Sequence, residues 1–400
     1  MFDLQVCDIN EFTSHYQGEP FDAVFTDAPY ELGFMGKDWD KAGVSFSHLT
    51  WLGIRNLLRP GSILLSFGGN RTYHRIAVAI EDGGFQIRDC VGYAWVHGNG
   101  FPKNHDFPSK IDNDVWEGYG TALKPAWEPV VLAMNPLDGT FANNAAMHGV
   151  AGLNVGRSRI GTANTIRANN KASIGYGGSN VPFSSGSTSG RWPANLIHDG
   201  SQETEGCFPD VPGQQGVVKG TEPTKNGFSG SVKYSGMINR IASAEPRGDT
   251  GSAARFFYAA KPHKKERDAG LPNGTKNDHP TVKPIELTKY LATMILPPVT
   301  GRPRRLLVPF CGSGSEMIGA LLAGWDEVVG IDLSKAYTEI AQIRLDWWLK
   351  MAGQLHTNNV ETILNYAFPS TTEKMEREDL SSLPLFSHPG SSGDQNNRGR

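Results

Sequence analysis

Residues 27–30 follow a short apolar run directly, and their side chains suit the binding of an amine. The run 22–26 predicts a buried strand, and Pro29 cannot continue a central strand. Asp27 and Tyr30 are therefore expected at the carboxyl end of a strand, where open α/β sheets bind ligands. Asp27 can accept a hydrogen bond from the exocyclic amine of a planar base, the Ala28 carbonyl can accept a second, and Tyr30 can stack on the ring. Taken alone, the tetrapeptide also fits a plain turn with a capping acid.

A second candidate site is a glycine turn near the end of the chain. The run 305–309 predicts a strand that leads into Gly312 and Gly314, and a helix follows. Glycines let the backbone approach a ligand closely and leave helix N–H groups free to face it. Met317 occupies the place of the third glycine of a dinucleotide fingerprint, which disfavours a nicotinamide cofactor. Asp332 ends the next strand about 20 residues on, the spacing at which a carboxylate meets a ribose hydroxyl.

Strands and helices alternate around both motifs, which predicts an α/β fold. The first third reads as half of a doubly wound sheet with an antiparallel edge. The pattern predicts strands at 1–6, 22–26, 62–67, 86–95, 129–134, 256–261, 305–309 and 327–332, and helices at 46–58, 72–81, 285–296, 315–322 and 335–349.

Composition excludes several classes of protein. The 400 residues carry a net charge of −3, so any nucleic-acid surface must be local. Four scattered cysteines form no C-x-x-C pair, which argues against a zinc site or a disulfide framework and fits a reducing cytoplasm. The N-terminus lacks the features of a signal peptide, and no segment is long and apolar enough to span a membrane.

Residues 139–198 contain no aspartate or glutamate, yet they carry several basic side chains. An acid-free basic stretch suits a surface that follows phosphates, although its many Asn, Gly and Ser residues also fit a flexible insertion. The predicted DNA contacts are Arg157, Arg159, Arg167, Lys171 and Arg191.

Three motifs resemble those of one enzyme family. Residues 27–30 resemble the Asp-Pro-Pro-Tyr motif of the DNA amino-methyltransferases, which methylate adenine at N6 or cytosine at N4. Residues 279–284 resemble their His-Pro-Thr-x-Lys-Pro signature, and residues 310–314 resemble the Phe-x-Gly-x-Gly loop of S-adenosylmethionine sites. The catalytic motif comes first, the basic stretch second and the cofactor loop last, an order that resembles the circularly permuted β class and its phage and prophage members.

This resemblance implies a Rossmann-like S-adenosylmethionine-dependent methyltransferase sheet, circularly permuted, with an inserted target-recognition region. It divides the chain into a catalytic half (1–135), the inserted DNA-binding region (136–252), a cofactor-binding half (253–355) and a disordered tail (356–400). The implied catalytic residues are Asp27, Ala28, Pro29 and Tyr30, and the implied cofactor contacts are Asp8, Thr281, Lys283, Phe310, Gly312, Gly314 and Asp332.

The implied reaction transfers a methyl group from S-adenosylmethionine to N6 of adenine in double-stranded DNA, with base flipping and without a metal. Two positions depart from the family pattern: Ala28 replaces a proline, and Val308 replaces an aspartate. Methylation of cytosine N4, a catalytically impaired DNA-binding relative and an RNA methyltransferase remain alternatives. No nuclease motif is recognised, so a solitary modification enzyme in the cytoplasm of a bacterium or a phage-infected cell is expected.

Overall fold

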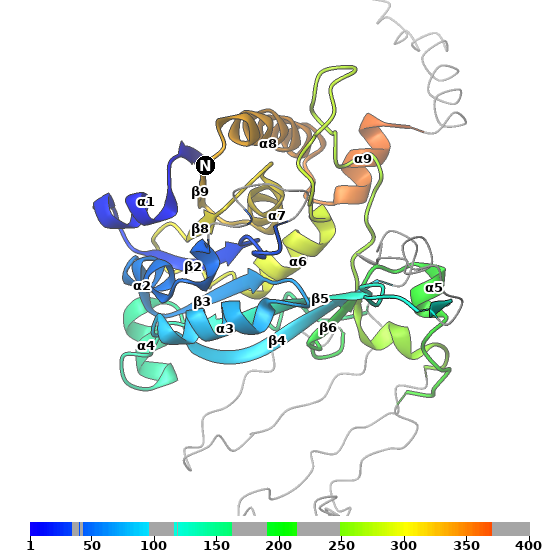
Figure 1. Ribbon diagram of the computed structural model, residues 1–400, viewed down its shortest axis with the longest axis horizontal. Coiled ribbons are helices and arrows are strands. Elements are labelled where there is room, and N and C mark those ends of the chain that lie inside the picture. The colour runs from blue at the N-terminus through cyan, green and yellow to red at the C-terminus, as the bar shows by residue number, and fades with distance from the viewer. Residues whose placement is uncertain are drawn as a thin grey trace, which may run out of the picture.

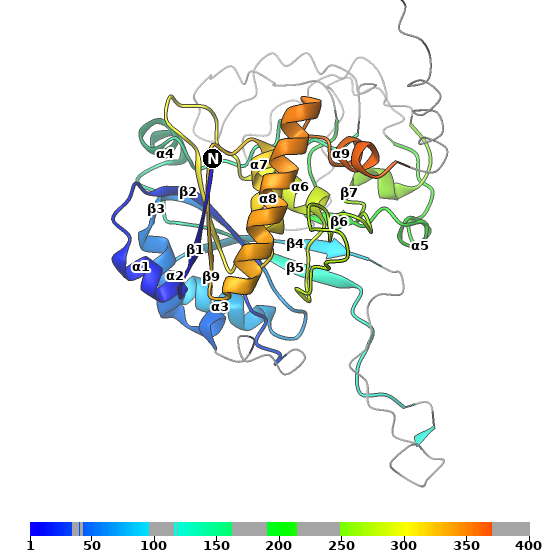
Figure 2. The ribbon, with the colours of Figure 1, turned by 90° about the horizontal axis from the view of Figure 1, so that it is seen from above.

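The computed structural model describes residues 1–33, 40, 43–95, 116–117, 119–161, 190–213 and 249–369. Within this part of the chain, one large sheet carries helices on both faces (Figures 1 and 2). The α/β, Rossmann-like class predicted from the sequence is confirmed.

The described strands form one sheet in the order β1-β9-β8-β2-β3-β5-β4-β6-β7. The strands are β1 (Phe2–Val6), β2 (Phe21–Thr26), β3 (Leu58–Phe67), β4 (Gln86–Ala94), β5 (Trp127–Met134), β6 (Leu196–His198), β7 (Tyr258–Ala259), β8 (Arg305–Pro309) and β9 (Glu327–Asp332). Strands from the two ends of the chain alternate, because β9 and β8 lie between β1 and β2. This interleaving brings the two predicted motifs to neighbouring strands.

β5 is antiparallel to both of its neighbours, β3 and β4, whereas the remaining strand pairs are parallel. The sequence predicted an antiparallel strand at the edge of the sheet, and this placement is wrong. β4 pairs with β5 on one side and with β6 on the other, and β6 pairs with β7. β5 therefore lies inside the sheet and not at its edge. The start of β5 therefore lies at the same edge as the carboxyl ends of β2 and β3.

The helices cover the two faces of the sheet in separate groups. They are α1 (Ile9–His15), α2 (His48–Asn56), α3 (Tyr73–Asp82), α4 (Phe141–His148), α5 (Gln202–Glu205), α6 (Ile285–Met294), α7 (Ser315–Ala323), α8 (Lys335–Leu355) and α9 (Val360–Ala367), with 3-10 turns η3 (Val44–Phe46) and η5 (Ala253–Phe256). β2 is buried throughout, and its side chains alternate between two cores. Val24 packs with the helices α1 to α3, and Phe25 packs with α6 to α8.

Two predicted domain boundaries differ from the described structure. β6 lies within the predicted insertion 136–252 but is a strand of the main sheet. α9 lies within the tail 356–400, which was predicted to be disordered. Val360 and Ile363 on one face of α9 are fully buried in the core, so the prediction is wrong for this helix. Residues 370–400 lie outside the described part of the chain.

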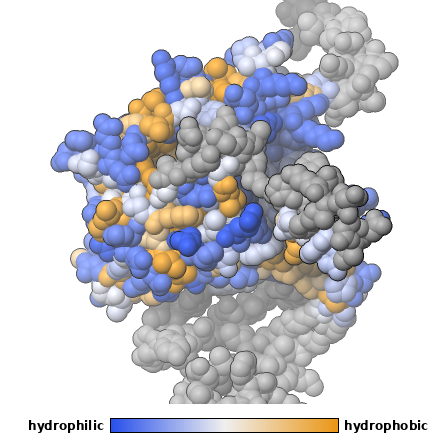
Figure 3. Space-filling model, viewed as in Figure 1, coloured by the Kyte–Doolittle hydropathy of each residue, from blue (hydrophilic) through white to orange (hydrophobic). Residues whose placement is uncertain are grey.

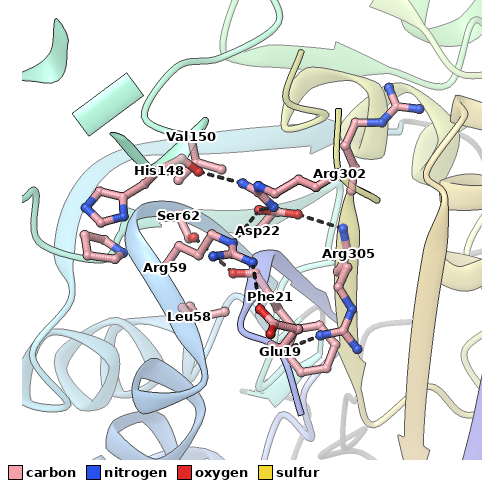
Figure 4. Close-up of polar contacts among 12 residues, drawn as sticks. Glu19, Phe21, Asp22, Leu58, Arg59, Ser62, His148, Val150, Arg302 and Arg305 are labelled. Atoms are coloured by element: carbon pink, nitrogen blue, oxygen red, sulfur yellow. Dashed lines mark hydrogen bonds and ion pairs between the residues drawn. The ribbon is translucent and has the colours of Figure 1, made fainter. Parts of the chain in front are cut away.

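A buried acid near the start of β2 joins the two parts of the chain (Figure 4). The side chain of Asp22 is fully buried and contacts the Arg302 guanidinium at 2.6 Å and that of Arg59 at 3.2 Å. Its second oxygen accepts the backbone N–H of Arg305 at 2.8 Å, where β8 begins. Because β2 and β8 pair through only two residues each, this cluster supplies additional contacts between the strands.

The face of the molecule shown in Figure 3 mixes hydrophilic side chains with smaller hydrophobic groups over the described residues. No helix among the described residues is long and apolar enough to cross a membrane.

Candidate active site

The turn after β2 places Asp27 and Tyr30 together at the edge of the sheet. Asp27 Oδ2 accepts a hydrogen bond from Lys283 Nζ at 2.6 Å, and Oδ1 accepts one from the Tyr30 hydroxyl at 2.9 Å. The Thr72 hydroxyl donates to the Tyr30 carbonyl at 2.7 Å and fixes the turn. The Asp27 side chain keeps 11% of its surface exposed, so it is held firmly and still faces a cavity.

Glu128 completes this cluster, although it was not predicted from the sequence. It lies at the start of the antiparallel strand β5, which the topology places at the same edge as Asp27. The Tyr30 hydroxyl donates to Glu128 Oε1, and Lys283 Nζ lies 3.4 Å from the same oxygen. Glu128 is the second residue of β5. In the sequence, the signal for it would have been an acid at the start of a strand predicted to run antiparallel.

Burial controls the protonation of this cluster. Burial and the two neighbouring carboxylates raise the pKa of Tyr30 well above its usual value, so the phenol keeps its proton. That single proton cannot be donated to Asp27 and Glu128 at once. The hydroxyl therefore donates to one carboxylate or the other at any moment, and burial raises the pKa of Glu128 while the Lys283 ammonium opposes the rise. Burial alone would lower the pKa of Lys283, but the Asp27 and Glu128 carboxylates raise it above the usual value.

Lys283 differs from its predicted role as a cofactor contact. Its ammonium is buried under Asp27 and Tyr30, and it lies 4.6 Å from the centre of the Phe67 ring. It is not among the residues that line the cavity, whereas Thr281, two residues earlier, does line it. Lys283 is therefore a buried partner of Asp27, whereas Thr281 can contact a ligand in the cavity.

The glycine turn after β8 is shaped by close packing. Gly312 has a φ of +49°, and a Cβ there would lie 2.6 Å from His279 Nε2, so a larger residue would displace the histidine. The Gly312 N–H donates to Asp332 Oδ2 at 2.8 Å. Gly314, with a φ of +82°, is the N-cap residue of α7 and packs against Ala341. Burial lowers the pKa of His279 to about 4, so its ring is neutral near pH 7.

A single cavity of about 1320 Å³ joins both motifs. Its lining includes the predicted residues Asp8, Asp27, Ala28, Pro29, Tyr30, Thr281, Phe310, Gly312 and Asp332, together with the unpredicted Glu128, His279 and Glu316. Gly314 does not line it, and Val308 is fully buried within β8, so it gives the cavity no polar group. No cluster of metal-ligating side chains was found among the described residues.

Asp8 lies just after β1, and Asp332 is the last residue of the adjacent strand β9, so both reach this cavity. Asp8 Oδ1 accepts the N–H of Asn10 at 2.7 Å and caps α1, a helix that the sequence did not predict. Asp332 Oδ1 accepts the N–H of Ser334 at 2.8 Å. Both carboxylates are therefore held by backbone groups and retain lone pairs that can face a ligand.

The predicted DNA contacts lie elsewhere. Arg157 donates to the carbonyl of Ala323 at 2.9 Å, and Arg159 donates to that of Gly190 at 3.3 Å. Arg191 forms an ion pair with Asp249. These three side chains contact the protein itself and do not line the cavity. The other two, Arg167 and Lys171, lie outside the described residues.

No protein-family model and no curated protein sequence matches this chain. Among solved structures it is similar to the cytosine-N4-specific PvuII DNA methyltransferase, at 12% identity over 86% of each chain and a TM-score of 0.45. It is similar to M1.HpyAVI at 13% identity over 86% of this chain and 99% of that one, with a TM-score of 0.40. It also resembles TTHA0409 of Thermus thermophilus, described as a DNA modification methylase and solved with S-adenosyl-L-methionine (14% identity, 87% and 94% coverage, TM-score 0.38). Because these scores are low, we base the functional assignment on the site.

Proposed function

We propose that this protein is an S-adenosylmethionine-dependent DNA methyltransferase that acts on the N6 amine of adenine. One observation carries the proposal: the Asp27–Tyr30 turn and the glycine turn at Gly312 line the same cavity. The first suits a planar base that bears an amine, and the second suits a nucleoside cofactor. A reaction between two such molecules needs this proximity.

The lining fits the cofactor in shape and chemistry. The cavity of about 1320 Å³ exceeds the roughly 300–1,000 Å³ of ordinary ligand pockets, which leaves room for a cofactor beside a base. Asp332 and Asp8 can accept hydrogen bonds from the ribose hydroxyls and the adenine amine. The bare backbone at Gly312 can approach the ligand closely. When bound, the cofactor supplies a methyl group activated by its sulfonium.

The residues at the other end of the cavity orient the base. The target nucleotide leaves the duplex, since its amine is otherwise paired and stacked. Tyr30 stacks on the base, while Asp27 and the Ala28 carbonyl accept hydrogen bonds from the two amine protons. These contacts draw the nitrogen lone pair out of the ring and aim it at the methyl group for direct in-line transfer. The new N–C bond replaces the S–C bond, the sulfonium leaves as a neutral thioether, and the surplus amine proton passes to water.

We assign Lys283 and Glu128 to the support of this arrangement. The ion pair of Lys283 with Asp27 and the contact of Glu128 with the Tyr30 hydroxyl fix both side chains before the base arrives. Such preorganisation lowers the cost of reaching the reactive geometry.

Incubation of the protein with unmethylated duplex DNA and methyl-labelled S-adenosylmethionine tests this assignment. Nucleoside mass spectrometry is expected to find the label in N6-methyladenine. Label in N4-methylcytosine would keep the reaction class and overturn the choice of base. Absence of label in DNA, with cofactor bound, would move the substrate to RNA or indicate an impaired relative.

A further inference from the structure

Glu316 is a buried acid of the cavity wall that the proposed reaction does not use. It is the second residue of α7, directly after the glycine turn, and only 5% of its surface is exposed. It lines the same cavity as Asp27. The carboxyl contacts its own backbone N–H, and no other described residue donates a hydrogen bond to it. A buried acid with so few partners at a ligand cavity suggests that the ligand is its partner.

Glu316 shares the cavity wall with other charged groups. Asp27 and Glu128 line the same cavity, and both pair with the Lys283 ammonium, at 2.6 Å and 3.4 Å. Arg344 faces the group from α8, but its guanidinium also donates to the carbonyl of Ser313 in the glycine turn. Burial and the charge of Asp27 raise the pKa of Glu316 to about 7, although Lys283 and Arg344 oppose the rise. A further cation bound beside Glu316 would favour its ionised form.

We propose that Glu316 is the counter-charge for the cationic sulfonium end of S-adenosylmethionine. The inference rests on the proposed function and deepens it. In-line transfer requires the sulfonium to lie opposite the amine that Asp27 holds, and Glu316 lines the same cavity as Asp27 from the first turn of α7. The product, S-adenosylhomocysteine, is a neutral thioether at the same sulfur. Transfer of the methyl group thus removes the attraction to Glu316 and favours release of the product.

This pairing couples cofactor binding to a proton. Because burial raises its pKa to about 7, Glu316 holds a proton near neutral pH far more often than an exposed glutamate does. A nearby cation favours the ionised carboxylate and lowers its pKa. Binding of S-adenosylmethionine is therefore expected to release a fraction of a proton near pH 7, and its affinity should rise from pH 6 to pH 8. Binding of S-adenosylhomocysteine should release less.

Titration calorimetry in two buffers of different ionisation enthalpy measures this release directly. The titrations use S-adenosylmethionine and S-adenosylhomocysteine with the wild type, Glu316→Gln and Glu361→Gln. Glu361 is the matched control because it also lies in the first turn of a helix, α9, but is exposed and away from the cavity. In Glu316→Gln the proton release should disappear, and the preference for S-adenosylmethionine over S-adenosylhomocysteine should fall at least about tenfold. Glu361→Gln should behave as the wild type.

The outcomes separate the two proposals. An unchanged preference in Glu316→Gln, with normal cofactor binding by the wild type, overturns the role of Glu316 and leaves the proposed function intact. Failure of the wild type to bind S-adenosylmethionine overturns both. If Glu316→Gln does not fold, the wild type decides: equal proton release for the two ligands overturns the inference.

Discussion

β2 has an acid near each end, and the two acids lie in opposite electrostatic surroundings. Asp22 is fully enclosed, and two guanidinium groups and a backbone N–H reach its oxygens. Asp27 opens to the cavity, has one ammonium as its ionic partner, and lies near two further acids, Glu128 and Glu316. Two cations therefore contact one acid directly, whereas the other has a single direct cationic partner among the described residues and further acids at the same cavity.

The difference separates an acid that joins parts of the chain from the acid that we propose to be catalytic. Where two cations and a backbone N–H share one buried carboxylate, the group can join parts of the chain but has nothing left for a ligand. Where carboxyl groups outnumber their cations, folding has left a charge imbalance that a ligand can correct. Pairing of charges distinguishes the two acids better than burial does, because both side chains are largely buried.

Loss of the Asp22 charge should produce the largest effect on stability. Asp22→Asn leaves Arg59 and Arg302 without their shared carboxylate, and breaking a buried ion pair costs about 3–5 kcal/mol. Urea unfolding measures the change in free energy. Glu327→Gln removes a more exposed partner of Arg305 and should cost about 0–1 kcal/mol. A similar cost for both variants would contradict the structural role of Asp22.

In contrast to Asp22→Asn, Asp27→Ala should act mainly on the rate of methyl transfer. We expect kcat to fall at least about a hundredfold, because the amine loses its orientation, while the Kd of S-adenosylmethionine stays unchanged. Labelled-methyl transfer and calorimetry measure the two quantities. Equal loss of transfer and of cofactor binding would count against the assigned role.

Sequence patterns located the residues of this site that lie in local strand–turn motifs. They did not locate the residue whose position depends on how distant strands pair in the sheet. Asp27, Tyr30 and Gly312 stand in local strand–turn patterns, and all three reach the cavity as predicted. Glu128 reaches it only because β5 runs antiparallel inside the sheet, which short-range patterns do not specify. Lys283 was predicted from a motif, but its side chain points to Asp27. The α/β class followed from the alternation of strands and helices, whereas α1 and α9 were missed.

The excess of acids at the cavity should lower stability as pH rises. The folded state raises the pKa of Glu316 from 4.5 to about 7, so it holds a proton that the unfolded chain has already lost. Its contribution to stability is therefore full below about pH 4.5 and is lost as pH rises through about 7, by at most ~3 kcal/mol.

Glu316→Gln removes this titration. Relative to the wild type, the variant should gain about 2 kcal/mol in unfolding free energy between pH 5 and pH 8. Glu266, another buried acid with a pKa raised to about 7, is present in both proteins and cancels from the comparison. Parallel pH profiles of the two proteins would show that Glu316 is not the titrating group.

Glu128→Gln should have a smaller effect, confined to transfer. The amide oxygen can still accept the Tyr30 hydroxyl, but the negative charge beside Lys283 is lost. We expect kcat to fall about tenfold and the Kd of S-adenosylmethionine to stay unchanged, with a further loss in Glu128→Ala, where the acceptor is missing. Single-turnover rates measure the step. Equal rates for Gln and Ala would show that the hydrogen bond to Tyr30 does not matter.

The smallest effect should come from Arg157. Its guanidinium donates to the Ala323 carbonyl at 2.9 Å, so Arg157→Ala should leave the salt dependence of DNA binding unchanged. Arg71 is exposed at the cavity, and Arg71→Ala should reduce the slope of log K against log salt by about one, as expected for one lost phosphate contact. Binding isotherms at several salt concentrations measure both slopes. A reduced slope for Arg157→Ala alone would place the DNA on the basic stretch, and the excess of charge at the cavity would then serve only the cofactor.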